Sequence, residues 1–240
     1  MLFHLQSGQP VCILEGARIS CLRTAAVTAI AADLLGTHPI ERLALLGAGA
    51  LARCHLELLP PRLPKLSEIR LYDLDPKRAS TLAAGTAAAT IVCDSAAQAI
   101  RGAQLVIPLT TTSSGYIQYD WLDPGALLVN VSLDDPLPEV VLRADKLFVD
   151  DWALVAADER RLLGRMLRVG QICGPNEMRD GARPIDGELG ELLTSANKGR
   201  SHADEIILLN PFGLAIEDLA LAHRVYHHAL QLDLGTMLER

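Results

Sequence analysis

Gly47 and Gly49 have the spacing of a nucleotide-binding turn. They follow an apolar run, Leu43–Leu46, and precede a segment with helical spacing, Ala50–Leu59. Glycine at the first position lets the chain turn sharply, and glycine at the second leaves no side chain between the backbone and a diphosphate. The helix that follows directs free N–H groups and the positive end of its dipole at that phosphate. We therefore predict a dinucleotide site whose cofactor-binding residues include Gly47, Gly49, Ala50 and Leu51.

Asp73 supports this interpretation, because it ends the next apolar run, Ile69–Tyr72. A carboxylate in that place accepts both ribose hydroxyls of an adenosine and repels a 2′-phosphate, which predicts NAD rather than NADP. The third glycine of the usual pattern is Ala52, which the pattern allows. The alternative is a glycine turn in an α/β protein that binds no ligand.

Two further polar segments follow predicted strands. The run 104–109 leads into a hydroxyl-rich loop, 110–115, and the run Ala126–Val131 leads into Ser132 and two carboxylates, Asp134 and Asp135. In open α/β sheets ligands bind at the carboxyl ends of strands, so we expect both acids to face the same crevice as Asp73 and the loop. A partly desolvated carboxylate can act as a base near neutral pH. The alternatives are an ordinary polar loop and a solvated turn before Pro136.

Arg23 opens an alanine-rich segment with helical spacing, Arg23–Leu35. A cation in the first turn of a helix opposes the helix dipole, and an anion held jointly by Arg23 and the helix N terminus would resolve that conflict. The alternative is a solvated arginine on an exposed turn.

The elements that must position these residues alternate along the chain. This pattern predicts an α/β fold with a Rossmann-type, doubly wound, mostly parallel sheet and helices on both faces. A hairpin is expected over Phe3–Glu15. Further strands are expected at Thr90–Asp94, Lys146–Asp150 and Glu205–Leu209, and further helices at Pro76–Gly85, Ser95–Arg101, Trp152–Leu167, Gly187–Thr194 and Leu214–Leu232.

We predict three parts in the chain. Residues 1–36 are expected to be the remnant of a second, α+β substrate and dimerisation domain, and residues 37–205 the NAD-binding domain. Residues 206–240 are expected to hold the last strand end and a long helix that returns to the substrate domain.

Composition limits the remaining possibilities. The 240 residues are 50% hydrophobic and carry a formal net charge of −7, without a cluster of basic residues. Nucleic acid and membrane are therefore not expected as partners. The 5 cysteines are scattered and are expected to be free thiols in a cytoplasmic protein. No metal site is expected, and His223, His227 and His228 are interpreted as helix-surface residues.

Several motifs resemble the ornithine cyclodeaminase/μ-crystallin family. The shared features are Arg23-Thr24-Ala25-Ala26, Gly47-Ala48-Gly49-Ala50, Tyr72-Asp73 and the aspartate at Asp135. The branch that makes 2,3-diaminopropionate for siderophores and peptide antibiotics is more similar. Its motifs here are 131–135, Val149-Asp150-Asp151-Trp152, Arg161-Leu162-Leu163-Gly164, Gly187-Glu188-Leu189-Gly190 and 210–218.

The resemblance implies an NAD-dependent oxidoreductase that acts on a CH–NH bond. Hydride leaves the glutamate Cα of N-(2-amino-2-carboxyethyl)-L-glutamate, and water then hydrolyses the imine to 2-oxoglutarate and 2,3-diaminopropionate. It also implies roles for residues. Arg23 binds the substrate carboxylate near the cofactor, Asp135 is the catalytic acid/base, Thr111 or Thr112 with Ser132 and Leu133 lines the nicotinamide half, and Phe212 and Gly213 belong to a loop that closes over the substrate.

The chain also departs from the family. Members carry a longer N-terminal segment, which supplies most of the substrate domain and the sheet through which they form homodimers; we expect it to be missing here. Where ornithine cyclodeaminases have a lysine shortly after the catalytic aspartate, this chain has Glu139. The alternatives are another amino-acid dehydrogenase, imine reductase or cyclodeaminase of the family, or a non-catalytic NAD-binding protein.

Overall fold

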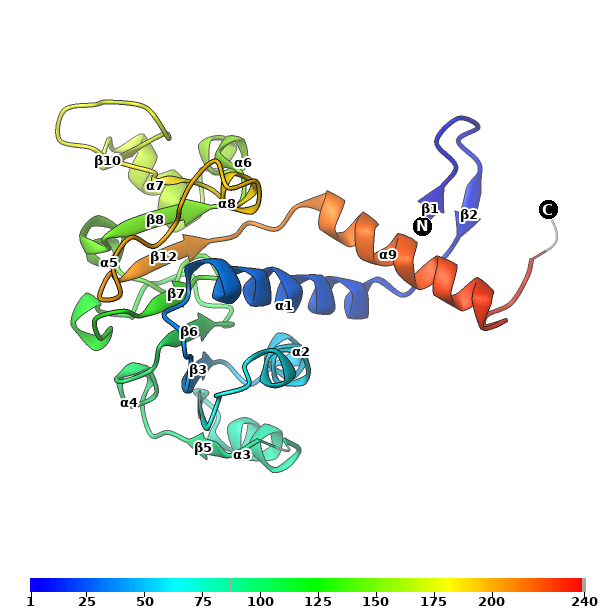
Figure 1. Cartoon of the computed structure of the whole chain (residues 1–240), viewed down its shortest axis with the longest axis horizontal. Coiled ribbons are helices and arrows are strands. Elements are labelled where there is room, and N and C mark those ends of the chain that lie inside the picture. The colour runs from blue at the N-terminus through cyan, green and yellow to red at the C-terminus, as the bar shows by residue number, and fades with distance from the viewer. Residues whose placement is uncertain (87, 239–240) are drawn as a thin grey trace.

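An eight-stranded sheet forms the centre of the molecule (Figure 1). The computed structural model describes residues 1–86 and 88–238. Every pair of neighbouring strands in this sheet is parallel. The predicted fold class is therefore confirmed. In spatial order the strands are β11 (Gly187–Glu188), β8 (Lys146–Val149), β12 (Ile207–Asn210), β7 (Leu127–Val129), β6 (Leu105–Pro108), β3 (Arg42–Leu46), β4 (Glu68–Tyr72) and β5 (Thr90–Val92).

Helices cover both faces of the sheet, and each face has its own apolar core. The central strands are buried along their whole length, as expected of a parallel sheet with two covered faces. The first core lies under α1 (Gly16–Leu35), α2 (Ala50–Leu58), α3 (Pro76–Ala84) and α8 (Leu189–Leu193). The second lies under α4 (Ala96–Ile100), α5 (Pro138–Arg143), α6 (Trp152–Ala157) and α7 (Leu162–Arg168).

The last strand, β12, lies inside the sheet between β7 and β8. Its register pairs Leu208 with Leu128 on one side and with Leu147 on the other. The chain then leaves the sheet into α9 (Ala215–Gln231). The division of the chain at residues 36 and 205 stays a prediction.

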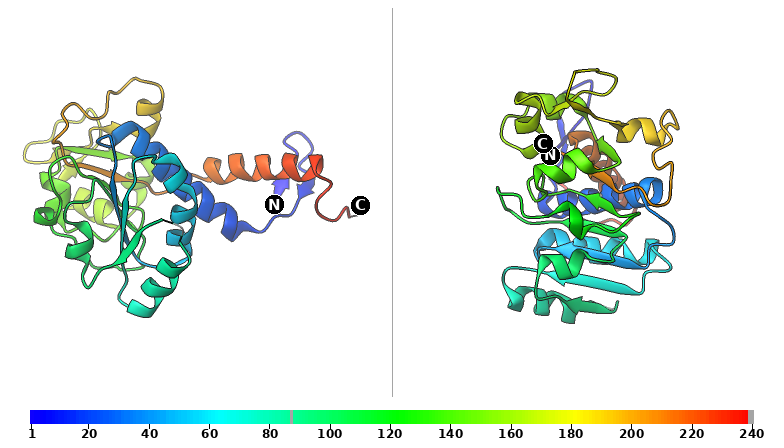
Figure 2. Two further views of the ribbon diagram at one scale, coloured as in Figure 1. Left: turned by 60° about the horizontal axis from the view of Figure 1, so that its bottom comes forward. Right: turned by 90° about the vertical axis from the view of Figure 1, so that its left-hand side faces the viewer.

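An arm extends from this body (Figures 1 and 2). We use this name for the hairpin of β1 (Leu2–Phe3) and β2 (Pro10–Cys12), the N-terminal half of α1, and α9. The hairpin confirms the strand–turn–strand prediction. α1 runs from the arm into the body, where it packs against α2, so one helix belongs to both parts.

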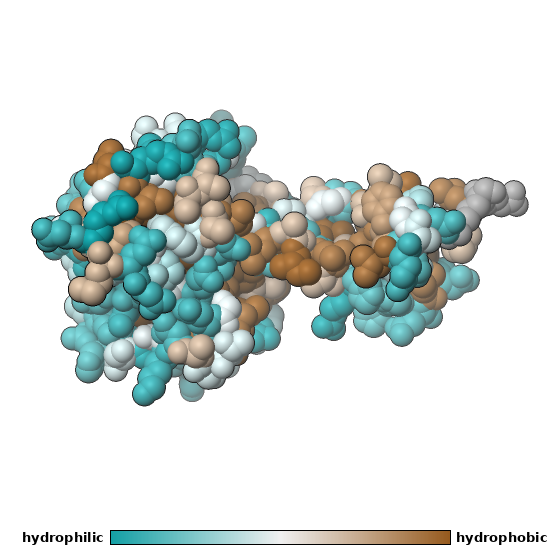
Figure 3. Space-filling model, turned by 90° about the horizontal axis from the view of Figure 1, so that it is seen from above, coloured by the Kyte–Doolittle hydropathy of each residue, from teal (hydrophilic) through white to brown (hydrophobic). Residues whose placement is uncertain are grey.

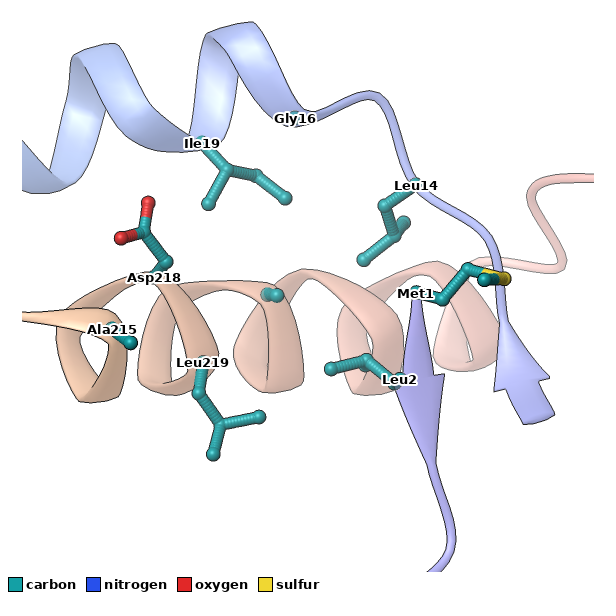
Figure 4. A pocket seen from close by; sticks show the side chains of 9 residues that line it. Met1, Leu2, Leu14, Gly16, Ile19, Ala215, Asp218 and Leu219 are labelled. Carbon is teal, nitrogen blue, oxygen red and sulfur yellow. The ribbon is translucent and has the colours of Figure 1, made fainter. Parts of the chain in front are cut away.

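A cavity of about 280 Å³ lies in the arm between the hairpin, α1 and α9 (Figure 4). Leu2, Leu14, Ile19 and Leu219 line it together with the carboxylate residue Asp218. Apolar side chains also gather on the outside of the arm (Figure 3). The arm therefore buries its apolar residues less completely than the body does.

Two predicted helices have other boundaries. The single helix expected over Trp152–Leu167 is wrong, because α6 and α7 are separate. The Asp158 carboxylate accepts the backbone N–H groups of Arg160 and Arg161, and this turn ends the first helix and starts the second. The segment expected as a helix from Gly187 begins instead with β11.

Two small strands and two 3-10 turns complete the described part of the chain. β9 (Ile172–Cys173) pairs with β10 (Arg183–Pro184) outside the main sheet, and η1 (Pro60–Arg62) and η2 (Tyr119–Trp121) lie in connections. Within residues 1–86 and 88–238, no helix combines the length and the hydropathy needed to cross a membrane.

Candidate active site

The glycine turn between β3 and α2 has the predicted shape. Gly47 has a φ of 102°, and a β-carbon there would lie 2.8 Å from the Leu109 carbonyl oxygen, so only glycine fits without strain. A β-carbon at Gly49 would meet no atom within 4 Å, so the space over its backbone is open. Among the described residues no side chain caps the N terminus of α2, which leaves its first N–H groups for a ligand.

Asp73 lies against this turn, and backbone groups hold its carboxylate. Oδ2 accepts the N–H of Ala48 at 2.6 Å, and Oδ1 accepts the N–H of Asp75 at 2.8 Å. The carboxylate is half-buried, and its position is fixed by the turn that would cradle the phosphates. An open glycine, an uncapped helix N terminus and an adjacent fixed carboxylate are the groups that an adenine dinucleotide needs, so these residues fit NAD.

The hydroxyl-rich loop lies next to the glycine turn. The Leu109 N–H donates to Leu46, and the backbone N of Thr110 lies close to where a β-carbon on Gly47 would stand. The loop is in turn fixed to the segment after β7, because the N–H groups of Tyr116 and Ile117 both donate to the Asp135 carbonyl. The strand ends of β3, β6 and β7 therefore contribute to one site.

Asp135 is fully buried under this loop, and its carboxylate accepts three hydroxyl groups. Ser132 donates to Oδ2 at 2.5 Å, and Thr110 and Tyr116 donate to Oδ1 at 2.7 and 3.0 Å. Burial raises the pKa of Asp135, although these hydrogen bonds act in the opposite direction. Burial also raises the pKa of Tyr116, so its hydroxyl stays protonated and donates. All three hydroxyl partners, Ser132, Thr110 and Tyr116, are half-buried.

Asp134 faces away from Asp135, so the expectation that both acids face one crevice is wrong. Its side chain is 2% exposed and pairs with two guanidinium groups, that of Arg161 just before α7 at 2.9 Å and that of Arg165 in α7 at 3.2 Å. The backbone between Ser132 and Asp134 takes a left-handed conformation at Leu133, with φ 76°. These arginines are thus partners of a buried carboxylate, a pairing that no local sequence pattern predicts.

Arg23 lies about two turns into α1, not in its first turn. The helix begins earlier because the Glu15 carboxylate caps the N–H groups of Ala17 and Arg18. The Arg23 guanidinium pairs with Glu217 at 3.1 Å and with Asp218 at 3.4 Å, both in the first turn of α9. Burial raises the pKa of Glu217.

Phe212 and Gly213 form the corner between β12 and α9. Gly213 has a φ of 89°, and a β-carbon there would collide with the Arg23 guanidinium. Its N–H donates to the Asp150 carboxylate at 2.6 Å. Phe212 is half-buried against the second core. The structure thus brings Arg23 and Gly213 together, with Asp150 as a partner that sequence reasoning missed.

The other predicted residues lie around the loop that covers Asp135. Thr111 is exposed, and the Thr112 hydroxyl donates to the Ser114 carbonyl. Among the three threonines of this run, the hydroxyl that donates to Asp135 is that of the first, Thr110. Any role of Thr111, Thr112 and Leu133 toward a nicotinamide stays a prediction.

The histidines of α9 lie on its surface. His223 and His227 are one turn apart and their Nε2 atoms are 2.9 Å apart. Within the described part of the chain, no group of three or more His, Cys, Asp and Glu side chains is arranged to hold a metal ion.

Comparison with protein families identifies the chain. The family model described as "Ornithine cyclodeaminase/mu-crystallin family" matches residues 1–233. This chain belongs to the ornithine cyclodeaminase/mu-crystallin family. The family resemblance seen in the motifs is thereby confirmed.

Curated relatives within the family have several activities. The N-((2S)-2-amino-2-carboxyethyl)-L-glutamate dehydrogenase of Staphylococcus aureus is 32% identical over 97% of this chain and 68% of that protein. The ketimine reductase mu-crystallin of Mus musculus is 28% identical over 94% of this chain and 67% of that protein. The chain thus spans about two thirds of the length of each.

Solved structures agree with the fold. CmnK has 36% identity and a TM-score of 0.90, over 99% of this chain and 69% of CmnK. The Thermococcus litoralis Δ1-pyrroline-2-carboxylate reductase, solved with NADH and L-proline, has 25% identity and a TM-score of 0.86, over 98% of this chain and 72% of that one. The chain therefore has the fold and family of NAD(P)-dependent amino-acid dehydrogenases and imine reductases.

Proposed function

We propose that this protein oxidises N-(2-amino-2-carboxyethyl)-L-glutamate with NAD and hydrolyses the product to 2-oxoglutarate and L-2,3-diaminopropionate. The observation that supports an oxidoreductase best is the glycine turn with the Asp73 carboxylate on the Ala48 N–H. The similarity to the staphylococcal enzyme, together with the branch motifs, supports this substrate.

The cofactor half recognises NAD by backbone and charge. The open backbone at Gly49 and the first N–H groups of α2 hold the diphosphate, and Asp73 accepts the ribose hydroxyls. A 2′-phosphate would meet the Asp73 charge, so NAD is preferred over NADP. Bound NAD supplies the hydride acceptor.

The substrate half moves protons and holds a carboxylate. Loss of hydride from the glutamate Cα leaves an imine and releases the amine proton. Asp135 takes this proton through the Ser132 or Thr110 hydroxyl, because its own carboxylate is buried. Protonated Asp135 returns this proton to the imine nitrogen, and the restored carboxylate takes a proton from water as the water oxygen adds to the imine carbon. Asp135 then gives that proton to the amine nitrogen and takes the proton of the new hydroxyl group as the C–N bond breaks, which releases 2,3-diaminopropionate and leaves the carbonyl of 2-oxoglutarate.

Arg23 binds a substrate carboxylate in this proposal. The guanidinium has Glu217 and Asp218 as partners, so an incoming carboxylate shares or replaces those ion pairs. The Phe212–Gly213 corner lies against Arg23 and closes over the substrate.

The direct test is incubation of the purified protein with NAD and N-(2-amino-2-carboxyethyl)-L-glutamate. We expect the absorbance of reduced nicotinamide to rise and both products to appear by chromatography. The alternative within the family is reduction of a cyclic imine, the activity named for the Thermococcus relative. Oxidation of reduced cofactor by Δ1-pyrroline-2-carboxylate, without turnover of the glutamate derivative, would favour it. Binding of NAD without turnover of either substrate would indicate a non-catalytic NAD-binding protein.

A further inference from the structure

The two adjacent acids after β7 are both buried but have different partners. Asp134 and Asp135 are 2% and 0% exposed. Asp134 has guanidinium partners, whereas Asp135 has hydroxyl partners. Two carboxylates so close would each disfavour ionisation of the other unless a nearby cation compensated one of them.

We infer that Arg161 and Arg165 are positioning residues for Asp135, and that they act through the ionised Asp134. This inference rests on the proposed function, in which Asp135 handles protons. Arg161 comes from the turn that separates α6 and α7, and Arg165 lies one turn further along α7. Together they pair with the buried Asp134 carboxylate.

The backbone at Leu133 connects the ion pairs of Asp134 with the position of Asp135. Leu133 is a non-glycine residue with a left-handed φ of 76°, a conformation that persists only where its surroundings enforce it. The enforcing contacts lie on both sides of the segment. The arginine pairs hold Asp134 on one side, and the Tyr116 and Ile117 N–H groups hold the Asp135 carbonyl on the other.

The charged groups around Asp135 determine in which direction each substitution should shift its pKa. Its hydroxyl partners Thr110, Ser132 and Tyr116 are neutral, and Tyr72 lies beyond Tyr116. Asp134 points toward its arginines but is the adjacent residue, and its charge favours the protonated form of Asp135. Loss of Asp134 therefore eases ionisation of Asp135, whereas loss of one arginine hinders it.

The variants are Asp134→Asn, Arg161→Gln and Arg160→Gln. Arg160 is the matched control, because among the described residues its side chain makes no contact with Asp134. The Arg160 carbonyl accepts a hydrogen bond from Arg165, but a substitution of the Arg160 side chain leaves that carbonyl in place. The readout is the acidic limb of kcat/KM against pH. We expect a shift of roughly half a unit to lower pH for Asp134→Asn, a similar shift to higher pH for Arg161→Gln, and none for Arg160→Gln.

A second readout does not depend on turnover. Carboxyl carbon-13 NMR, with the Asp135 resonance assigned from Asp135→Asn, follows the same titration in each variant. If the parent protein shows no turnover, the proposed function fails while this titration still decides the inference. Opposite shifts for Asp134→Asn and Arg161→Gln support it. Shifts in the same direction, equal effects of Arg160→Gln and Arg161→Gln, or a lowered melting temperature with unmoved titrations would overturn it.

Discussion

Asp73 and Asp135 both lie beyond the carboxyl ends of strands in one sheet, but different groups bind them. Asp73 is half-buried and accepts backbone N–H groups, which cannot rotate away or release a proton at neutral pH. Asp135 is fully buried and accepts side-chain hydroxyls, which can do both. The first arrangement suits recognition by a fixed charge, and the second suits proton transfer.

The largest expected effect is that of Asp135→Asn. Loss of the acid/base should lower turnover about 10²–10⁴-fold, while affinity for NAD stays unchanged. Steady-state kinetics and calorimetry on the same preparation measure the two quantities. Equal turnover in variant and parent would remove Asp135 from the proposed mechanism.

The free energy of unfolding should decrease at acid pH because of a histidine in α2, the helix that follows the glycine turn. His55 on α2 is fully buried, and burial lowers its pKa from 6.5 to about 4. Its Nδ1 faces the Leu51 carbonyl and its Nε2 faces the Thr28 hydroxyl, so it is held neutral. The unfolded chain binds a proton that the native His55 refuses, so stability falls as the pH drops from 6.5 toward 4, by on the order of 3 kcal/mol in total.

Urea unfolding at about pH 7 and about pH 5 measures this contribution. His55→Gln should lose that part of the pH dependence, and His223→Gln, on the surface of α9, should keep it. An identical pH dependence in the parent and in His55→Gln would contradict the assignment.

A smaller effect is expected for Asp73→Ala, which should weaken NAD binding by about 1–3 kcal/mol, the scale of hydrogen bonds to a charged group. Turnover at saturating cofactor should change little, in contrast to Asp135→Asn. Asp73→Asn should narrow the preference for NAD over NADP, because it removes the repulsion of a 2′-phosphate. Unchanged affinity by calorimetry would argue against the cofactor site.

The smallest effect is expected for Thr110→Val, which removes one of the hydroxyls on Asp135. A loss of about 1 kcal/mol corresponds to roughly fivefold lower kcat/KM. The acidic limb should move to higher pH, because a donor to the carboxylate is lost. Thr111→Val, at the exposed neighbouring position, is the matched control and should have no effect on that limb.

Much of the fold could be predicted, because its signals are local in sequence. Apolar runs that end in Asp73 or in the threonine loop marked the central strands. The helix expected from Ser95 starts there, because the Ser95 hydroxyl caps the Gln98 N–H of α4. The predicted helix ends were wrong at two places where a carboxylate side chain binds backbone N–H groups. Glu15 starts α1 before Arg23, and Asp158 divides the segment between Trp152 and Leu167.

The site was predicted less completely, because side-chain direction depends on residues far apart in the chain. Sequence placed Asp134 and Asp135 at the same strand end but could not tell which would meet the hydroxyl loop. That choice depends on Arg161 and Arg165, which lie at the start of α7 and within it. Arg23 likewise meets Glu217 across most of the chain length, a pairing without a local pattern.

The position of β12 inside the sheet determines the order in which the strands can pair during synthesis. β8 and β11 join the rest of the sheet through residues 207–210, so these strands have no docking surface until that segment has been synthesised. Strands β3 to β7 can associate earlier, because their partners precede them or follow closely. A nascent chain therefore exposes the edge of β7 from the synthesis of residue 129 until that of residue 207, and an arrest within this interval leaves that edge open to other chains.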